Sequence, residues 1–356
     1  MGEVGKVRKR MNEINKVKFI FISPGYYPHI GGMEYVIKSI VERLVKMGHE
    51  VTVIAGEPDI DEPREEEING VKIIRWPTWT PSGAYHFPKR RKELEMLLKN
   101  VAEKVDIVHV HSIHTIFTVN AGMYVADLAP KAKLVVTTYY HGSGHSTFRN
   151  LAWILWRKKV SRFLKRAEVI HALSKRERSF LVSHYPEIKE KITVIPSGVD
   201  EDVISYKWKG QESNYIIYAG RVEKYKRLDL ALEIAKEMGL RLLIVGKGSY
   251  RDIFKKNAER EYGGSVEFLE PQPRNKYLEL LSNARYAINL SQHESFSLFT
   301  AEAITIGVPT ITSREIVENL EAIAKPFKRD LFVIHSARIY TWNDILSEYM
   351  KKIYRC

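Results

Sequence analysis

Hydrophobic and polar positions alternate along the start of the chain in the two spacings that distinguish strands from helices. Residues 17–23 and 51–55 are short, mostly apolar runs, and residues 33–47 carry apolar side chains at a 3.6-residue spacing. Short apolar runs are typical of buried strands, and the longer spacing is typical of an amphipathic helix that Gly48 ends. The order predicts a βαβ unit beginning at residue 17.

The same pattern continues to the end of the chain. Apolar runs at 106–111, 134–138, 169–173 and 192–195 predict further parallel strands, a helical segment spans 149–166, and Asn69-Gly70 predicts a tight turn. The pattern then restarts, with strands expected at 215–219, 240–245, 266–269, 286–290 and 309–312 and a helix at 228–238. Two successive series of this kind predict two doubly wound α/β domains, whose ligands bind at the carboxyl ends of the strands. The expected site is a cleft between the two domains.

The domain boundaries follow from these series and from a polar, linker-like stretch at 205–214. We predict a first Rossmann-like domain at 17–204 and a second at 205–339. A basic N-terminal extension occupies 1–16. Residues 340–356 form a C-terminal helix that we expect to cross back to the first domain.

Composition excludes some classes of protein and favours others. The chain has 356 residues, a formal charge of +13 and one cysteine, Cys356. A single cysteine excludes an intramolecular disulfide and favours a reducing compartment, and no apolar run approaches the ~20 residues of a membrane span. We expect a cytoplasmic protein with anionic partners, and its scarce glutamine and abundant Lys and Glu are typical of thermophiles. The basic residues are dispersed and match no nucleic-acid module.

Glycines and cations follow several of the predicted strands. Gly31-Gly32 opens a helix, where backbone N–H groups can approach a phosphate; the alternative is a loop that needs positive φ. Arg221 and Lys226 follow the first strand of the second domain and can neutralise a diphosphate, or belong to a solvated basic loop. Gly246 and Gly248 begin a dinucleotide fingerprint, but Arg251 stands at the third glycine position, which argues against an NAD site.

Residues 294–302 form the most informative segment. Either Ser295 or Ser297 can cap a helix that ends before Gly307. Glu294 lies in the preceding loop and Glu302 about one turn inside the helix, where a carboxylate can accept hydrogen bonds from ribose hydroxyls. The alternative for Glu302 is an exposed helical glutamate, although its apolar neighbours favour a packed helix.

This segment resembles the E-x7-E motif of the retaining family-4, group 1 glycosyltransferases, which have the GT-B fold. Residues 28–34, 48–54, 106–111, 195–200, 220–229, 244–248 and 307–309 resemble further motifs of that family in the same order. The resemblance covers roughly residues 17–312. It implies a retaining, metal-independent hexosyltransferase that binds a nucleotide-diphosphate sugar and needs no cofactor, with UDP, GDP or ADP as the nucleotide.

The resemblance also implies roles for individual residues. Arg221 and Lys226 match the pair on the diphosphate, Glu302 the ribose ligand and Glu294 the ligand of the donor sugar. His141 resembles the active-site histidine beside that sugar, and base contacts are expected from the backbone at 270–274. The implied catalytic residues are His141, Glu294, Arg221 and Lys226. The implied donor-binding residues are Gly31, Gly32, Arg221, Lys226, Glu294, Ser295, Phe296, Ser297, Leu298, Phe299 and Glu302.

One departure from the family pattern is compatible with functions other than glycosyl transfer. The family carries Gly-Gly-x-Pro-Glu after the position of Ser313, whereas this chain continues with residues 314–318, which lack a Gly-Gly pair, and its tail is shorter. A trimmed domain edge is compatible with a nucleotide-binding scaffold that has lost catalysis. The GT-B fold also serves nucleotide-sugar epimerases, which act without an acceptor.

Histidines and basic aromatic segments suggest two further hypotheses. His109, His111, His114, His141 and His145 can form a metal cluster, but no cysteine and few carboxylates lie nearby, so active-site or core histidines fit better and we predict no metal. The aromatic loop at 76–87 and the basic helix at 153–166 fit a sugar or an anionic membrane surface. The acceptor is accordingly a glycan, a lipid-linked molecule or a small molecule. For 153–166 we favour a solvated basic helix with its aromatics in the core.

Overall fold

A computed structural model describes residues 16–29, 31–81, 85–142, 147–262 and 265–355, and the chain divides into two compact units. The first unit is formed by the described residues up to Ala172, by Arg178–Val194 and by the described residues from Leu346 on. The second is formed by Leu173–Glu177 and Ile195–Ile345. Residues 1–15 of the predicted N-terminal extension lie outside the described residues.

The first unit is built on one sheet with the strand order β3-β4-β2-β1-β6-β7-β8-β9, and β5 pairs with β4. All neighbours in this order are parallel except the β3–β4 pair, which Asn69-Gly70 connects as predicted. The strands are β1 (Lys18–Ser23), β2 (Glu50–Glu57), β3 (Arg64–Ile68), β4 (Val71–Trp79), β5 (Phe87–Pro88), β6 (Ile107–His111), β7 (Lys133–Thr137), β8 (Val169–Ala172) and β9 (Ile192–Val194).

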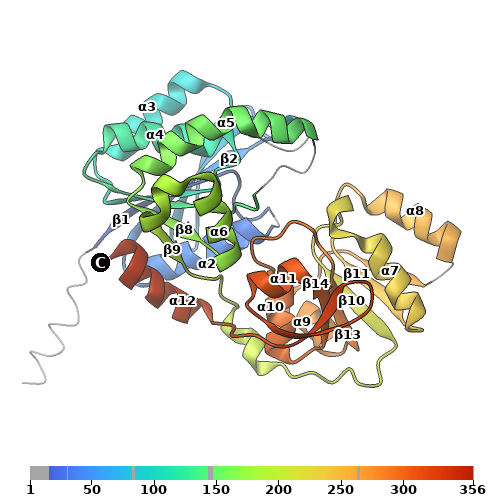
Figure 1. Cartoon of the computed structure of the whole chain (residues 1–356). Coiled ribbons are helices and arrows are strands. Elements are labelled where there is room, and N and C mark those ends of the chain that lie inside the picture. Colours follow the sequence, from blue (N-terminus) through green and yellow to red (C-terminus); the bar gives the residue numbers. More distant parts are fainter. Residues whose placement is uncertain (1–15, 30, 82–84, 143–146, 263–264, 356) are drawn as a thin grey trace, which may run out of the picture. The chain divides into compact units, whose positions relative to one another are not determined.

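Helices cover both faces of this sheet because successive side chains of each strand point to opposite faces. Ile20 and Ile22 of β1 join a core with α3, α4 and α5, which Figure 1 shows stacked along one side of the sheet. Phe19 faces the other side, where its ring lies 5.0 Å from that of Tyr354. The helical segments are α2 (Gly32–Lys46), α3 (Arg91–Ala102), α4 (Ile116–Leu128), α5 (Thr147–Arg166), α6 (Lys175–His184) and the 3₁₀ segment η2 (Pro186–Lys191).

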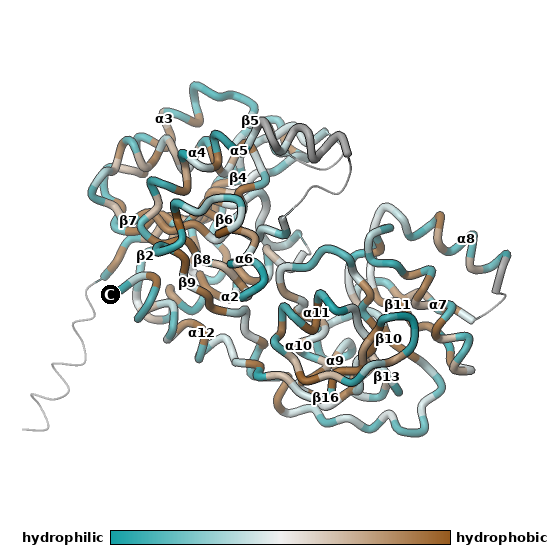
Figure 2. The backbone as a smooth tube through the Cα atoms, viewed as in Figure 1, coloured by the Kyte–Doolittle hydropathy of each residue, from teal (hydrophilic) through white to brown (hydrophobic). Residues whose placement is uncertain are grey.

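The second unit has a sheet with the strand order β12-β11-β10-β13-β14-β16-β15, parallel as far as β14 and antiparallel beyond it. Its strands are β10 (Tyr215–Ala219), β11 (Arg241–Val245), β12 (Val266–Leu269), β13 (Tyr286–Asn289), β14 (Thr310–Ser313), β15 (Ile323–Pro326) and β16 (Leu331–Ser336). Brown, hydrophobic stretches lie around β10, β11 and β13 in Figure 2. The helical segments are η3 (Glu201–Ser205), η4 (Lys224–Lys226), α7 (Leu228–Glu237), α8 (Arg251–Tyr262), α9 (Arg274–Ser282), α10 (Leu298–Ile306) and α11 (Arg314–Asn319).

The C-terminal segment returns to the first unit, as predicted. It consists of α12 (Trp342–Glu348) followed by a π-helical turn, η5 (Tyr349–Tyr354). The Tyr354 hydroxyl lies 2.8 Å from Nδ1 of His109, and the Tyr349 hydroxyl lies 3.1 Å from Nδ1 of His171. These buried contacts join the end of the chain to β6 and β8.

The predicted aromatic loop at 76–87 is partly wrong. β4 continues through Trp79, and Trp76 is buried, with its indole N–H donating to the Lys89 carbonyl at 2.9 Å. Trp79 is exposed and its ring lies 5.4 Å from that of Phe87, while residues 82–84 lie outside the described residues. The aromatic spacing reflects the two faces of a strand, one of which packs into the core.

We expect the buried histidines of β6 to make the first unit sensitive to acid. Burial lowers the pKa of His111 to about 3, and burial together with His111 and His171 lowers the pKa of His109. Unfolded histidine binds a proton near pH 6.5, so the stability of the folded state is full above that pH and falls below it. Each of the two histidines lowers the free energy of unfolding by about 1.4 kcal/mol for every pH unit below 6.5. This loss continues until the pH reaches the pKa of that histidine in the folded state. Urea unfolding at about pH 7 and about pH 5 measures the loss.

A histidine substitution identifies the titrating group. His111→Phe keeps an aromatic ring against Phe21, whose ring centroid lies 5.7 Å from that of His111. The variant should lose about 2 kcal/mol less than the wild type between the two pH values. His335 is exposed, and His335→Phe serves as the control. Equal losses in the wild type and the His111→Phe variant would contradict the assignment.

Candidate active site

The strand order brings the predicted cations and the first glutamate of the motif together. β10 lies between β11 and β13, so the chain reverses its strand order at β10, and ligands of doubly wound sheets bind at such a point. The loop that follows β10 carries Arg221 and Lys226, and the loop that follows β13 carries Glu294. The Gln292 backbone N–H donates to the Tyr225 carbonyl at 3.2 Å, which joins the two loops.

Lys226 and Glu294 form an ion pair whose side chains are only 11% and 15% exposed. Burial by itself lowers the pKa of Lys226, but the Glu294 carboxylate and the hydroxyls of Tyr218 and Tyr225 raise it above its ordinary value. The ammonium is therefore charged at neutral pH. A cation and a carboxylate lie side by side, the first suited to a phosphate oxygen and the second to sugar hydroxyls.

Arg221 is exposed at the start of the same loop, and its Nη2 donates to the Tyr225 hydroxyl at 3.1 Å. The glycines that resembled a dinucleotide fingerprint have a different role here. A Cβ on Gly246 would lie 2.0 Å from the Gly220 carbonyl oxygen, and one on Gly248 would lie 2.2 Å from that of Val222. The two glycines permit the loop after β11 to pack against the loop that carries Arg221.

Ser297, and not Ser295, caps α10. Its Oγ accepts the Thr300 backbone N–H at 3.3 Å and the Asn289 side-chain N–H at 2.8 Å. Asn289 ends β13, so the cap is fixed to the strand that precedes the site loop. The helix ends at Gly307, which has φ +94°, as the sequence predicted. Ser297 and Phe299 are buried, whereas Ser295, Phe296 and Leu298 are half-buried.

Glu302 is 6% exposed, so the alternative of an exposed helical glutamate is wrong. Its carboxylate accepts Nη1 of Arg274 at 2.5 Å and the Tyr277 hydroxyl at 2.5 Å. Burial raises the pKa of Glu302, while the hydrogen bonds and charge of these partners lower it. Arg274 also donates to Asp202 at 3.0 Å and 3.1 Å.

Sequence reasoning missed these two partners of Glu302. Residues 270–274 were expected to contribute backbone, yet the Arg274 side chain supplies the cation of this cluster. Arg274 and Tyr277 are three residues apart on α9, a spacing that places both on one face of a helix. That spacing was readable in the sequence, but it does not reveal that Glu302 of α10 lies opposite.

In the first unit, Gly31 and Gly32 lie at the start of α2, in the loop that follows β1. β1 is the strand at which this sheet reverses its order, between β2 and β6. Gly31 has φ −167°, and neither glycine has positive φ, so the alternative of a left-handed loop position is wrong. The loop is braced by Arg75, which is buried and donates to the Tyr27 carbonyl at 2.6 Å.

His141 follows β7 in the same unit and is half-buried. Its ring lies 5.0 Å from that of His114, which follows β6. His109 and His111 lie on one face of β6, with ring centroids 4.2 Å apart. Nε2 of His109 is 2.7 Å from Thr137 Oγ1, and Nδ1 of His111 is 3.1 Å from the Tyr139 hydroxyl. Within the described residues no group of three His, Cys, Asp or Glu is arranged for a metal, and His145 lies outside them.

Comparison with known families accounts for almost the whole chain. The family described as Glycosyltransferase Family 4 matches residues 30–203, and the one described as Glycosyl transferases group 1 matches residues 201–351. The chain belongs to the family 4, group 1 glycosyltransferases.

Individual glycosyltransferases agree with this assignment. The chain is 24% identical over 321 residues to an uncharacterized glycosyltransferase of Methanocaldococcus jannaschii, covering 83% of this chain and 80% of the relative. It is 23% identical over 314 residues to the GDP-mannose:cellobiosyl-diphosphopolyprenol alpha-mannosyltransferase of Xanthomonas campestris, covering 83% and 78%. The structure of sucrose-phosphate synthase from Thermosynechococcus elongatus aligns with a TM-score of 0.64 at 17% identity, covering 84% and 82%. These likenesses confirm the predicted GT-B fold.

The segment in which this glycosyltransferase departs from the family pattern packs against the candidate site. Residues Arg314–Asn319 form the short helix α11 after β14. The Asn319 side chain donates to the Glu294 carbonyl at 2.7 Å and accepts the Ser174 hydroxyl at 3.1 Å. Ser313 donates to the Ser291 carbonyl at 3.1 Å. The segment without Gly-Gly thus holds the loop that carries Glu294.

Gly32→Ala should separate ligand binding from folding in this glycosyltransferase. A Cβ at Gly32 would have no atom within 4 Å, and the residue is exposed at the first position of α2. Alanine is favoured over glycine in a helix by up to ~1 kcal/mol, so the unfolding midpoint should stay or rise. If a donor phosphate approaches this backbone, the added methyl group should raise the KM for the donor about tenfold, or ~1.4 kcal/mol. An unchanged KM would contradict that role.

Proposed function

We propose that this glycosyltransferase moves a hexosyl group from a nucleotide-diphosphate sugar to a hydroxyl acceptor, with retention of anomeric configuration and without a metal ion. The ion pair of Lys226 and Glu294 at the strand-order reversal of the second unit is the observation that carries the proposal. A cation suited to a phosphate and a carboxylate suited to sugar hydroxyls lie next to one another in this pair. A nucleotide-diphosphate sugar presents those two groups to a site.

Each candidate residue acquires a specific task in this reaction. Lys226, with Arg221, stabilises the charge that develops on the diphosphate as the bond from the anomeric carbon to the phosphate oxygen breaks. The N-terminus of α10 adds a favourable dipole. Glu294 accepts hydrogen bonds from hydroxyls of the donor sugar, and Glu302 accepts those of the ribose. These fixed cations and dipoles supply the charge that a metal ion supplies in other transferases.

The anomeric configuration is retained because the acceptor oxygen attacks the anomeric carbon from the face on which the leaving group departs. The acceptor oxygen bonds to the anomeric carbon, and its proton passes to the departing phosphate oxygen, so no protein carboxylate is needed as base. His141 would lie beside the donor sugar. This proposal rests on the family resemblance of these positions, and the product's anomeric configuration, read by proton NMR, tests it.

A thermal-shift panel tests the donor site first. UDP-, GDP- and ADP-hexoses are compared with and without EDTA, and a donor at 100 times its Kd should stabilise the protein by about 2.7 kcal/mol. GDP-mannose leads the panel because the Xanthomonas campestris relative carries it in its name. The Arg221→Ala/Lys226→Ala variant should lose the shift. Lys224→Ala removes an exposed cation from the same loop and should keep it.

The outcome of the panel separates the alternatives. A shift with one nucleotide, equal with and without EDTA and absent from the double variant, supports the proposal. Lipid-linked sugars with a diphosphate, the acceptor class in the name of the same relative, are the first acceptors to test. Turnover to an epimerised sugar without acceptor would contradict transfer, and no shift with any nucleotide would overturn the donor site.

A further inference from the structure

Helix α5 of the first unit presents a strongly basic face away from the core. Trp153 and Trp156 pack against the core cluster, and the Trp156 indole N–H donates to the Ile113 carbonyl at 3.1 Å. Arg157, Ser161 and Lys165 follow at intervals of four residues, and Lys158 and Arg162 lie beside them. Residues spaced in this way share one helix face.

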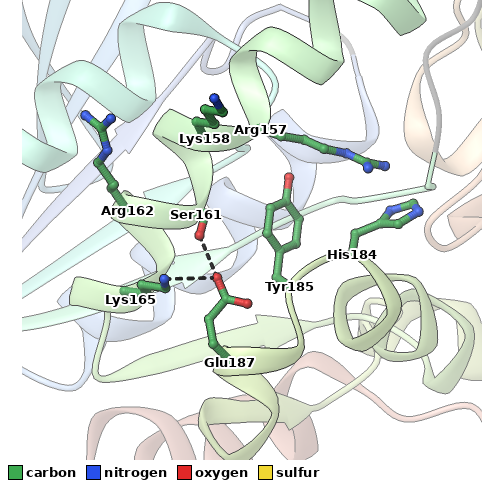
Figure 3. A pocket seen from close by; sticks show the side chains of 8 residues that line it. All are labelled: Arg157, Lys158, Ser161, Arg162, Lys165, His184, Tyr185 and Glu187. Carbon is green, nitrogen blue, oxygen red and sulfur yellow. Dashed lines mark hydrogen bonds and ion pairs between the residues drawn. The ribbon is translucent and has the colours of Figure 1, made fainter.

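This face borders a hollow of about 380 Å³ within the first unit. Its walls come from α5, the end of α6 and the start of η2, as Figure 3 shows. The lining residues are Arg157, Lys158, Ser161, Arg162, Lys165, His184, Tyr185 and Glu187.

The positive charge of the hollow is only partly neutralised. Its carboxylate, Glu187, is engaged by Lys165 at 3.4 Å and accepts the Ser161 hydroxyl at 2.6 Å. Lys158 and Arg162 are exposed and pair with no carboxylate in the part of the chain that the structure describes. Burial, followed by the charges of Arg91 and Arg162, lowers the pKa of the neighbouring Lys159. The charge of Arg162 thus acts on the Lys159 ammonium beside the hollow.

Two polar atoms of the hollow are buried without a hydrogen bond from the described residues: the Tyr185 hydroxyl and Nε of Arg157. Tyr185 is 2% exposed, and Figure 3 shows its hydroxyl pointing toward Arg157. A buried hydroxyl without a partner costs about 1–3 kcal/mol in general. Such a cost is offset where a ligand supplies the missing acceptor.

We infer that this hollow binds a phosphate or diphosphate group, with Arg157 and Arg162 as its main ligands and Tyr185 as a hydroxyl donor. A phosphate offers several acceptor oxygens and negative charge, and the planar guanidinium fork binds two of those oxygens at once. The site is separate from the nucleotide site proposed in the second unit, because all its residues belong to the first unit.

The hollow also borders the loop that carries His141. The Tyr140 hydroxyl lies 2.5 Å from Nδ1 of His184, and Arg157 hydrogen-bonds the same hydroxyl. A phosphate bound by Arg157 would thus lie beside a loop that follows the carboxyl end of β7. That position fits the phosphate of an acceptor or the headgroup of an anionic lipid.

Isothermal titration with inorganic pyrophosphate tests the site in the full chain. Pyrophosphate can also occupy the nucleotide site, so wild type is compared with Arg157→Gln/Arg162→Gln and with Arg166→Gln. Arg166 lies on the same helix, outside the hollow, and pairs with Asp127 at 2.5 Å. The double variant should bind about one equivalent of pyrophosphate less than the wild type, or should bind that equivalent at least tenfold more weakly. Arg166→Gln should bind pyrophosphate with the stoichiometry and affinity of the wild type. Arg162→Gln alone, which removes no described contact partner, should weaken the same equivalent and guards against misfolding of the double variant.

Flotation with vesicles distinguishes the source of the phosphate. Vesicles of phosphatidylcholine with and without phosphatidylglycerol are mixed with the same variants. If the wild type and Arg166→Gln bind the anionic vesicles and the double variant does not, the result supports a phosphate site in the hollow. It also identifies a lipid headgroup as the source of the phosphate. Pyrophosphate binding without flotation supports the hollow and identifies a soluble phosphate. Equal pyrophosphate stoichiometry and affinity in wild type, Arg162→Gln and the double variant would overturn the inference, whatever the nucleotide panel shows.

Discussion

Lys226→Ala should abolish most transferase activity, with kcat/KM for the donor falling by about 10² to 10³. The ammonium is the buried cation at the strand-order reversal, and its pKa is held above the ordinary lysine value, so it carries charge at any pH at which the enzyme works. Removing it takes away a fixed charge opposite the leaving diphosphate. Initial rates at several donor concentrations measure the loss, and Lys224→Ala should remain close to wild type.

The same substitution should also destabilise the second unit. Truncating one partner of a buried ion pair leaves the other charge without compensation, which generally costs about 3–5 kcal/mol. Here Glu294 would be the uncompensated group, because its side chain is 15% exposed. Urea unfolding measures this cost.

A double variant separates the two effects. Lys226→Met/Glu294→Gln removes both charges and should recover most of the lost stability, since replacing both partners avoids an isolated buried charge. Its activity should remain as low as that of Lys226→Ala. Recovery of activity together with stability would mean that Lys226 acts only on folding, and the catalytic assignment would be wrong.

Local sequence patterns predicted many of the helices and strands, although not β15 and β16, and they did not predict which elements lie beside one another. The 3.6-residue spacing and the apolar runs predicted α2, β1, β2, α7 and β10 to within a few residues. The order of strands in a sheet depends on crossover connections that local periodicity does not encode. The contact of Lys226 with Glu294, 68 residues away, depends on β10 lying beside β13.

The choice between Ser295 and Ser297 illustrates the same limit. Both residues precede the apolar run and both are favourable caps, so local preference does not distinguish them. Asn289 decides the choice, because its side chain reaches Ser297 from the end of β13. The contacts of Glu302 show a different limit. The family resemblance pointed to Glu302 itself, but Arg274 and Tyr277 belong to a segment whose side chains were given no role.

Arg274→Gln should weaken donor binding about 10- to 100-fold, the scale of a hydrogen bond to a charged group. Burial raises the pKa of Glu302, and Arg274 opposes that rise with its charge and hydrogen bond. Asp200, whose pKa burial raises to about 6, and Asp202 add negative charge to the same cluster. Without the guanidinium the pKa of Glu302 rises further, so the ribose hydroxyls lose the carboxylate acceptor over a wider range of pH.

The pH dependence of donor affinity tests this explanation. In Arg274→Gln, affinity should improve as pH rises, because the raised pKa of Glu302 is then exceeded and the carboxylate returns. Glu302→Gln should bind the donor as weakly as Arg274→Gln, but its affinity should not depend on pH. The variant with both substitutions should bind the donor no more weakly than either single variant, since both substitutions remove the same interaction. Lys276→Gln, on the same helix and paired with Glu279 at 3.0 Å, is the matched control. Additive losses in the combined variant would show that Arg274 contacts the donor independently, and the positioning role would then be rejected.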